Sequence, residues 1–126
     1  MNATLEHVNV TVEDPAAVAE VLKQLFGWTV RWQGPALDNG FTVHVGTEGS
    51  YLALYRPGRG VKPAMPRYMH AGSFAHIGIV VGDLDAAEAR VSAAGFEPHS
   101  HADYEPGRRF YFDGPGNVEI EVISYA

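Results

Sequence analysis

The chain has 126 residues, of which 46% are hydrophobic and 19% charged, so it has room for one globular domain and differs from the polar compositions that stay disordered. Nine Lys and Arg against fifteen Asp and Glu give a net charge of -6, which excludes the positive surface that a nucleic-acid partner requires. There is no cysteine, so disulfides and thiolate metal sites are excluded and a bound metal needs His, Asp or Glu ligands.

The first six residues have neither the basic stretch nor the apolar stretch of a signal peptide. No later apolar run approaches the roughly 18 residues of a membrane span. We therefore expect a cytoplasmic protein without a membrane partner.

The first predicted strand spans Leu5 to Val12, where apolar and polar residues alternate. This alternation places Val8, Val10 and Val12 on one face and His7 on the other. We expect the valines to contact the core.

A helix is predicted next, over Ala16 to Phe26, because apolar residues recur there at helical spacing. Asp14 is a suitable N-cap, Pro15 suits the first turn and Gly27 ends the helix. Three further strands are predicted, separated by glycine-containing turns: Trp28 to Gln33, Phe41 to Gly46 and Tyr51 to Arg56. The first half is therefore βαβββ.

Residues 57–72 are rich in proline and glycine and lack a period, which predicts a linker. After it, a strand over Phe74 to Val81 and a helix over Gly82 to Ala94 repeat the opening, with Asp83 again at the cap position. Three more strands follow: Glu97 to His101, Arg109 to Asp113 and Val118 to Ser124. The second half is also βαβββ.

The two halves form an internal repeat. Placing LEHVNVTVED over FAHIGIVVGD superposes His7 on His76 and Asp14 on Asp83. A chance likeness of valine-rich strands does not explain why the cap and the histidine return together. We predict an α+β fold of one domain, 1–126, in which two modules, about 4–56 and 73–126, form a curved mixed sheet around a cleft.

Four side chains are expected to point toward that cleft. The aliphatic residues mark the helix-covered face, so His7, His76, Glu119 and Glu121 lie on the opposite one. An unpaired carboxylate is costly to bury, which indicates a nearby cation. Two imidazoles and one carboxylate suit Fe(II), Mn(II), Zn(II), Ni(II) or Co(II).

The alternative is a purely structural role for these residues. Glu119 or Glu121 would then pair with Arg108 or Arg109 on the neighbouring strand, and the strand histidines would only be hydrogen-bonded.

The strand histidines in LEHVNV and FAHIGI, the double βαβββ order and the closing FDGPGNVEIEVISY resemble the glyoxalase, bleomycin-resistance and extradiol-dioxygenase superfamily, also called vicinal oxygen chelate proteins. The resemblance covers nearly the whole chain. Its members include lyases, isomerases, dioxygenases, thiol transferases and metal-free drug-binding proteins, so it leaves the reaction open. It also implies a homodimer, whose modules pair within one chain or are exchanged between two chains.

The resemblance implies the metal ligands His7, His76 and Glu121. Glu119 stays an alternative to Glu121, because GNVEIEV is offset by one residue from the commonest spacing. Ala53 stands where glyoxalase-like members have a fourth, acidic ligand. Three ligands resemble the dioxygenase branch, but extradiol dioxygenases are usually larger than this chain.

Weaker candidates for acid-base or substrate contacts are His44, Tyr55 and His101. We expect His99 and His101 to share one strand face, where a histidine could transfer a proton near neutral pH. The alternatives are ordinary sheet packing for the tyrosine and a solvated hairpin for the two histidines.

The sequence thus predicts a small metal-dependent lyase, isomerase or dioxygenase whose small substrate is chelated through neighbouring oxygens. The alternative is a metal-free protein that sequesters an aromatic or hydrophobic compound, with Trp32, Tyr51 and Tyr55 as walls. The substrate and the identity of the metal stay open.

Overall fold

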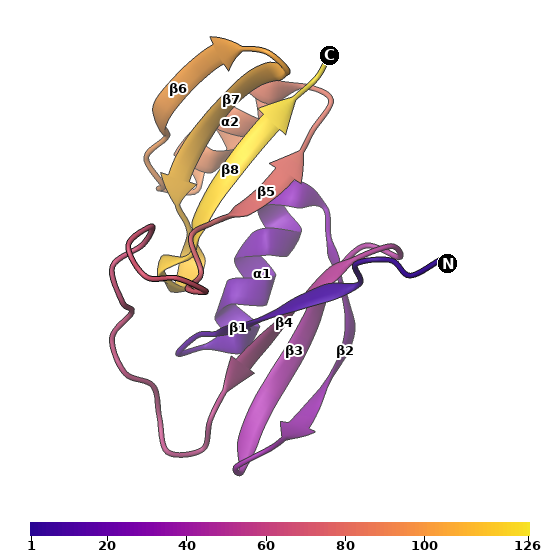
Figure 1. The fold of residues 1–126 in the computed structure, drawn as a ribbon, viewed down its shortest axis with the longest axis vertical. Helices are drawn as coiled ribbons and strands as arrows, with labels where there is room; N and C mark the ends of the chain where they lie inside the picture. Colours follow the sequence, from indigo (N-terminus) through magenta and orange to yellow (C-terminus); the bar gives the residue numbers. More distant parts are fainter. The chain divides into compact units, whose positions relative to one another are not determined.

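The computed structural model describes residues 1–126, which form two compact units, Met1–Lys62 and Pro63–Ala126. Each unit contains one α-helix and one four-stranded mixed sheet (Figure 1). The predicted α+β class and the two βαβββ modules are confirmed.

The first unit has the strand order β1-β4-β3-β2. β1 and β4 are parallel, and the other neighbours are antiparallel. Its elements are β1 His7–Thr11, α1 Pro15–Phe26, β2 Thr29–Ala36, β3 Gly40–Gly46 and β4 Tyr51–Arg56.

The second unit repeats this arrangement, with the strand order β5-β8-β7-β6 and a parallel pair of β5 and β8. Its elements are β5 Ile77–Val80, α2 Leu84–Ala93, β6 His99–Tyr104, β7 Gly107–Asp113, the 3-10 turn η1 Pro115–Asn117 and β8 Glu119–Ser124. The identical order confirms the internal repeat.

Both helices begin with the same capping interaction. Asp14 accepts a hydrogen bond of 3.1 Å from the backbone N–H of Ala17, and Asp83 accepts one of 3.0 Å from that of Ala86. Gly27 ends α1 with a φ of 70°, a left-handed conformation that glycine adopts without a steric penalty. Neither helix is long and apolar enough to cross a bilayer.

The core of the first unit lies between α1 and its sheet, where Leu22 and Leu54 are almost fully buried. Val10 and Val12 are buried as predicted, but Val8 is 39% exposed. The expectation for Val8 is wrong because β1 is an edge strand and α1 packs mainly against β3 and β4.

The core of the second unit lies between α2 and the strands β7 and β8. Its largest fully buried side chains are Val91, Phe110, Phe112, Ile120 and Val122. Because side chains alternate along a strand, the residues between these in β7 and β8 lie on the face away from α2. We call this the site face of the second unit; it carries Arg109, Tyr111, Glu119 and Glu121.

Some predicted bounds differ from the observed ones. β5 is shorter than the predicted 74–81, because only Ile77–Val80 pairs with β8. β6 reaches Tyr104 rather than ending at His101, because it stays paired with β7 up to Gly107. Residues 57–72 contain no helix or strand.

Candidate functional site

A histidine and two carboxylates meet on the site face of the second unit. His76, which directly precedes β5, has its Nε2 atom 3.4 Å from Oε1 of Glu121 and its Nδ1 atom 3.9 Å from Oε1 of Glu119. The parallel register explains this arrangement, because Ile77 pairs with Ile120 and His76 therefore lies beside Glu119. The imidazole ring therefore lies between both candidate acids of β8.

Glu121 is held through its other oxygen. Oε2 accepts hydrogen bonds from Nη1 of Arg109 at 3.0 Å and from the hydroxyl of Tyr111 at 3.1 Å. Burial, together with the bond to Glu121, raises the pKa of Tyr111. The cross-strand pairing considered from the sequence is thus present for Arg109, whereas Arg108 binds Asp85 of α2 at 2.8 Å.

Glu119 is bound by a residue that comes from the segment before β5. The hydroxyl of Tyr68 donates a hydrogen bond to Oε1 of Glu119 and lies 2.9 Å from Nδ1 of His76. Burial of this hydroxyl and its bond to Glu119 raise the pKa of Tyr68 to about 12. One phenol thus contacts both an acid and the histidine.

The neighbouring Arg67 attaches this segment to the sheet. Its Nη1 atom lies 3.1 Å from Asp113 and 3.8 Å from Glu119, and its Nη2 atom donates to the backbone carbonyl of Asn117 at 2.7 Å. His99, Asp113 and Glu119 have side-chain ligand atoms within 4.8 Å of one another. Because Arg67 contacts both carboxylates of that group, the group already has a positive partner.

A row of rings crosses the sheet of the first unit. His7 stacks on Tyr51 at 4.9 Å, Tyr51 on His44 at 4.7 Å, and His44 is tilted against Trp32 at 5.3 Å. The guanidinium of Arg31 lies 4.4 Å from the centre of the Tyr51 ring. The row ends at Trp32, which is 52% exposed.

Some polar groups on this sheet have hydrogen-bond partners, and the pKa of others is shifted by burial. Nδ1 of His7 lies 2.8 Å from Glu6, and this contact lowers the pKa of the Glu6 carboxyl. Burial, followed by nearby positive charges, lowers the pKa of His44. The hydroxyl of Tyr55 donates to the backbone carbonyl of Leu37 at 2.8 Å, so this candidate has a structural hydrogen bond.

Comparison with known families identifies the fold. A sequence model of the Glyoxalase/Bleomycin resistance protein/Dioxygenase superfamily matches residues 4–122. The chain belongs to this superfamily.

Solved structures agree with that assignment. A glyoxylase/bleomycin resistance protein/dioxygenase domain from Frankia sp. EAN1pec is 18% identical, with a TM-score of 0.82 over 98% of both chains. TnmS3, an antibiotic binding protein from Streptomyces sp. CB03234, is 18% identical, with a TM-score of 0.74 over 99% of this chain and 98% of that one. The trypanothione-dependent glyoxalase I of Leishmania major is 18% identical, with a TM-score of 0.75 over 98% and 88%. At such identities the likeness shows the fold alone. No curated protein sequence matches the chain.

The three ligands that the superfamily resemblance implies are distributed over both units. His76 and Glu121 lie next to each other in the second unit, and His7 belongs to the first. Ala53 is buried, offers no ligand atom and pairs with His44 of β3. This superfamily member therefore lacks a metal-binding side chain at the fourth-strand position.

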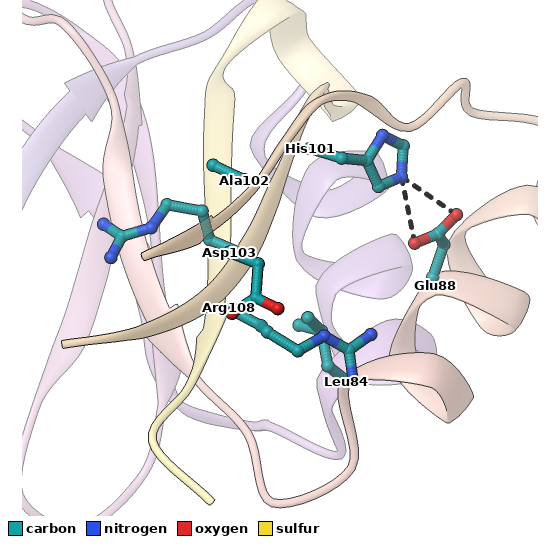
Figure 2. A pocket seen from close by; sticks show the side chains of 7 residues that line it. Leu84, Glu88, His101, Ala102, Asp103 and Arg108 are labelled. Atoms are coloured by element: carbon teal, nitrogen blue, oxygen red, sulfur yellow. Dashed lines mark hydrogen bonds and ion pairs between the residues drawn. The ribbon is translucent and has the colours of Figure 1, made fainter. Parts of the chain in front are cut away.

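His101 lies apart from the site face. Figure 2 shows it pointing toward Glu88 of α2, with its Nε2 atom 3.1 Å from each carboxylate oxygen. The pocket around it is lined by Leu84, Glu88, His101, Ala102, Asp103, Arg108 and Arg109. This candidate acid or base thus contacts a helix residue rather than His76.

The expectation that His99 and His101 share one strand face is wrong. β6 contains a bulge in which Ser100 and His101 lie opposite the single residue Phe110 of β7. Ser100 has a φ of 55°, which turns the backbone. His99 therefore stacks on Tyr111 at the site face, whereas His101 lies against Phe110 on the α2 side.

Two residues that contribute to this site, Tyr68 and Tyr111, were not predicted from the sequence. The sequence contains a signal for Tyr111, because the apolar Phe110 and Phe112 flank it and the alternation of the strand places it on the face of Glu121. Tyr68 had none, because its segment has no periodicity that would assign it to a face.

Proposed function

We propose that the protein is a metal-dependent enzyme with His7, His76 and Glu121 as ligands. The observation that supports this most is the distance of 3.4 Å between Nε2 of His76 and Oε1 of Glu121. Two donor atoms that each lie about 2.1 Å from one tetrahedral ion are about 3.4 Å apart. The third ligand, His7, is assigned from the superfamily pattern and the internal repeat.

The chain's own residues would prepare this donor set. Arg109 and Tyr111 bind Oε2 of Glu121, while Oε1 lies 3.4 Å from Nε2 of His76. Contacts of this kind around a metal ligand fix its orientation. An ion such as Fe(II), Mn(II), Zn(II), Ni(II) or Co(II) would act as a Lewis acid on a small substrate chelated through neighbouring oxygens. The reaction class is lyase, isomerase or dioxygenase.

A metal-free binding protein is the second candidate. The ring row of His7, Tyr51, His44 and Trp32 supports it, because stacked rings with an exposed tryptophan at one end suit a planar apolar ligand. The similarity to TnmS3, an antibiotic binding protein, is consistent with this function.

Proton competition separates the two candidates. A ligand histidine must be neutral, so metal affinity falls as the pH drops below the ordinary histidine pKa of about 6.5. With two histidine ligands, log affinity approaches a slope of about two per pH unit, and with one it approaches about one.

The measurement is a titration of untagged protein with Mn(II) or Ni(II) between about pH 5.5 and 8, with circular dichroism as the folding control. A steep profile supports the enzyme. A flat profile, or no metal binding while the fold persists, contradicts it and supports the metal-free binder.

We also propose that the chain forms a homodimer, since its superfamily commonly assembles in that way. Light scattering over a range of protein concentrations tests this, and a mass equal to one chain at every concentration would contradict it.

A further inference from the structure

The Tyr68 hydroxyl bridges a gap that the other two groups cannot span alone. Nδ1 of His76 and Oε1 of Glu119 are 3.9 Å apart, beyond hydrogen-bond distance. The phenol oxygen lies 2.9 Å from Nδ1 and donates to that carboxylate oxygen. The three groups therefore form one chain of hydrogen bonds.

The number of protons in this series of hydrogen bonds fixes the direction of each bond. A phenol has one proton and an ionised carboxylate only accepts, so the proton of Tyr68 lies toward Glu119. The phenol oxygen must then accept from His76, which requires a proton on Nδ1. In a neutral ring, Nε2 is left with a free lone pair.

That lone pair lies close to another acceptor. Nε2 of His76 and Oε1 of Glu121 are 3.4 Å apart, and with the proton on Nδ1 neither atom has a hydrogen to share. Two acceptors this close to each other favour a cation between them.

We propose that Tyr68 is a positioning residue: through Glu119 it holds His76 in the Nδ1–H tautomer and so presents Nε2 as the ligand atom, a role that rests on the proposed metal function. Arg67, the residue before Tyr68, helps to hold the tyrosine in place by binding Asp113 and the backbone carbonyl of Asn117. The segment before β5 thereby becomes part of the site.

The first test measures the tautomer without any metal. Nitrogen NMR of 15N-histidine-labelled protein at pH 8, with the His76 signals assigned through His76→Gln, reports which ring nitrogen carries the proton. We expect Nδ1–H in the unsubstituted protein and a mixture of both tautomers in Tyr68→Phe. Tyr68 is 63% exposed and Phe keeps its ring, so the core should not change. Tyr125→Phe removes another exposed phenol and is the matched control.

A Tyr68→Phe protein that keeps a single Nδ1–H tautomer would overturn the proposal, because Glu119 would then hold the ring without the phenol. A neutral His76 that is protonated on Nε2 in the unsubstituted protein would also overturn it.

The second test is the affinity for Mn(II). Loss of a group that orients a ligand lowers affinity by about 10 to 100-fold, which we expect for Tyr68→Phe and not for Tyr125→Phe. If Tyr68→Phe shifts the tautomer but neither protein binds metal, the positioning is supported and the proposed metal function fails. If the tautomer shifts and affinity is unchanged in a protein that binds metal, the role of Tyr68 at the metal is overturned.

Discussion

Arg109 and Glu121 form an ion pair of 3.0 Å in which the side chains expose only 10% and 13% of their surface. Removal of one partner from such a pair leaves the other charge poorly solvated and without compensation. The neighbouring Arg108 forms a pair of similar length with Asp85, but those side chains are 51% and 79% exposed. We therefore expect the two adjacent arginines to make very different contributions to the stability of the fold.

We expect Arg109→Ala to lower the melting temperature markedly and Arg108→Ala to change it little, because exposed ion pairs contribute almost nothing to stability. Thermal unfolding followed by circular dichroism compares them. An equal loss of melting temperature in both variants would show that Glu121 without its arginine costs no more than the loss of an exposed ion pair. The Arg109–Glu121 pair would then not be an important support of the site.

Substitution of the ligand histidine tests the site directly. We expect His76→Ala to lower Mn(II) or Ni(II) affinity tenfold or more, because it removes one of three proposed ligands. Substitution of a residue that only orients a ligand already lowers affinity by roughly 10 to 100-fold. The far-UV circular dichroism spectrum should stay intact, since His76 lies on the site face and outside the α2 core.

The matched control is His70→Ala, in which an exposed histidine of the segment before β5 is removed. A similar loss of affinity in both variants would point to nonspecific binding by surface histidines. If His76→Ala unfolds and the unsubstituted protein binds no metal, the histidine is structural.

The half-buried His44 predicts a pH effect on stability. Burial lowers its pKa in the folded state, so the unfolded chain, with an ordinary histidine pKa of about 6.5, binds the proton more strongly. The neutral ring's contribution is therefore complete above about pH 6.5, and stability falls as the pH drops below that value.

Urea unfolding at pH 7.5 and 5.5 measures this effect. The loss of unfolding free energy between the two pH values should be smaller in His44→Phe than in the parent, and unchanged in His70→Phe. A loss of the same size in His44→Phe would assign the pH dependence to other groups.

The repeated helix caps predict two equal effects. Asp14→Ala and Asp83→Ala should each lower the unfolding free energy by about 1 kcal/mol, because each removes one side-chain bond to a free backbone N–H of the first helical turn. Urea titration monitored at the helix signal provides the values. Glu13→Ala, an exposed acid beside the first cap, should have little effect, and an equal effect there would indicate a general charge effect instead.

The features that could be predicted from the sequence are those set by neighbouring residues in the chain. The caps at Asp14 and Asp83 depend on a single turn, and the alternation of β8 alone places Glu119 and Glu121 on one face. His76 was found because the first half of the chain contains the same pattern with His7.

The features that were missed depend on tertiary packing. Tyr68 contacts Glu119 across a separation that no local pattern encodes. The position of His101 depends on a bulge, which shifts the strand's alternation by one residue and is not signalled by a glycine at Ser100. Where the backbone departs from regular geometry, a strict period assigns side chains to the wrong face.

The bulge also has a consequence for changes in chain length. In β6, Ser100 is the extra residue, since His99 pairs with Tyr111 and the strand returns to register at Ala102. Deletion of Ser100 would place His101 directly opposite Phe110 and leave the two histidines on the faces they occupy now. A shorter strand without the left-handed residue is therefore compatible with the same sheet, and a one-residue deletion at this point would preserve both surfaces of the unit.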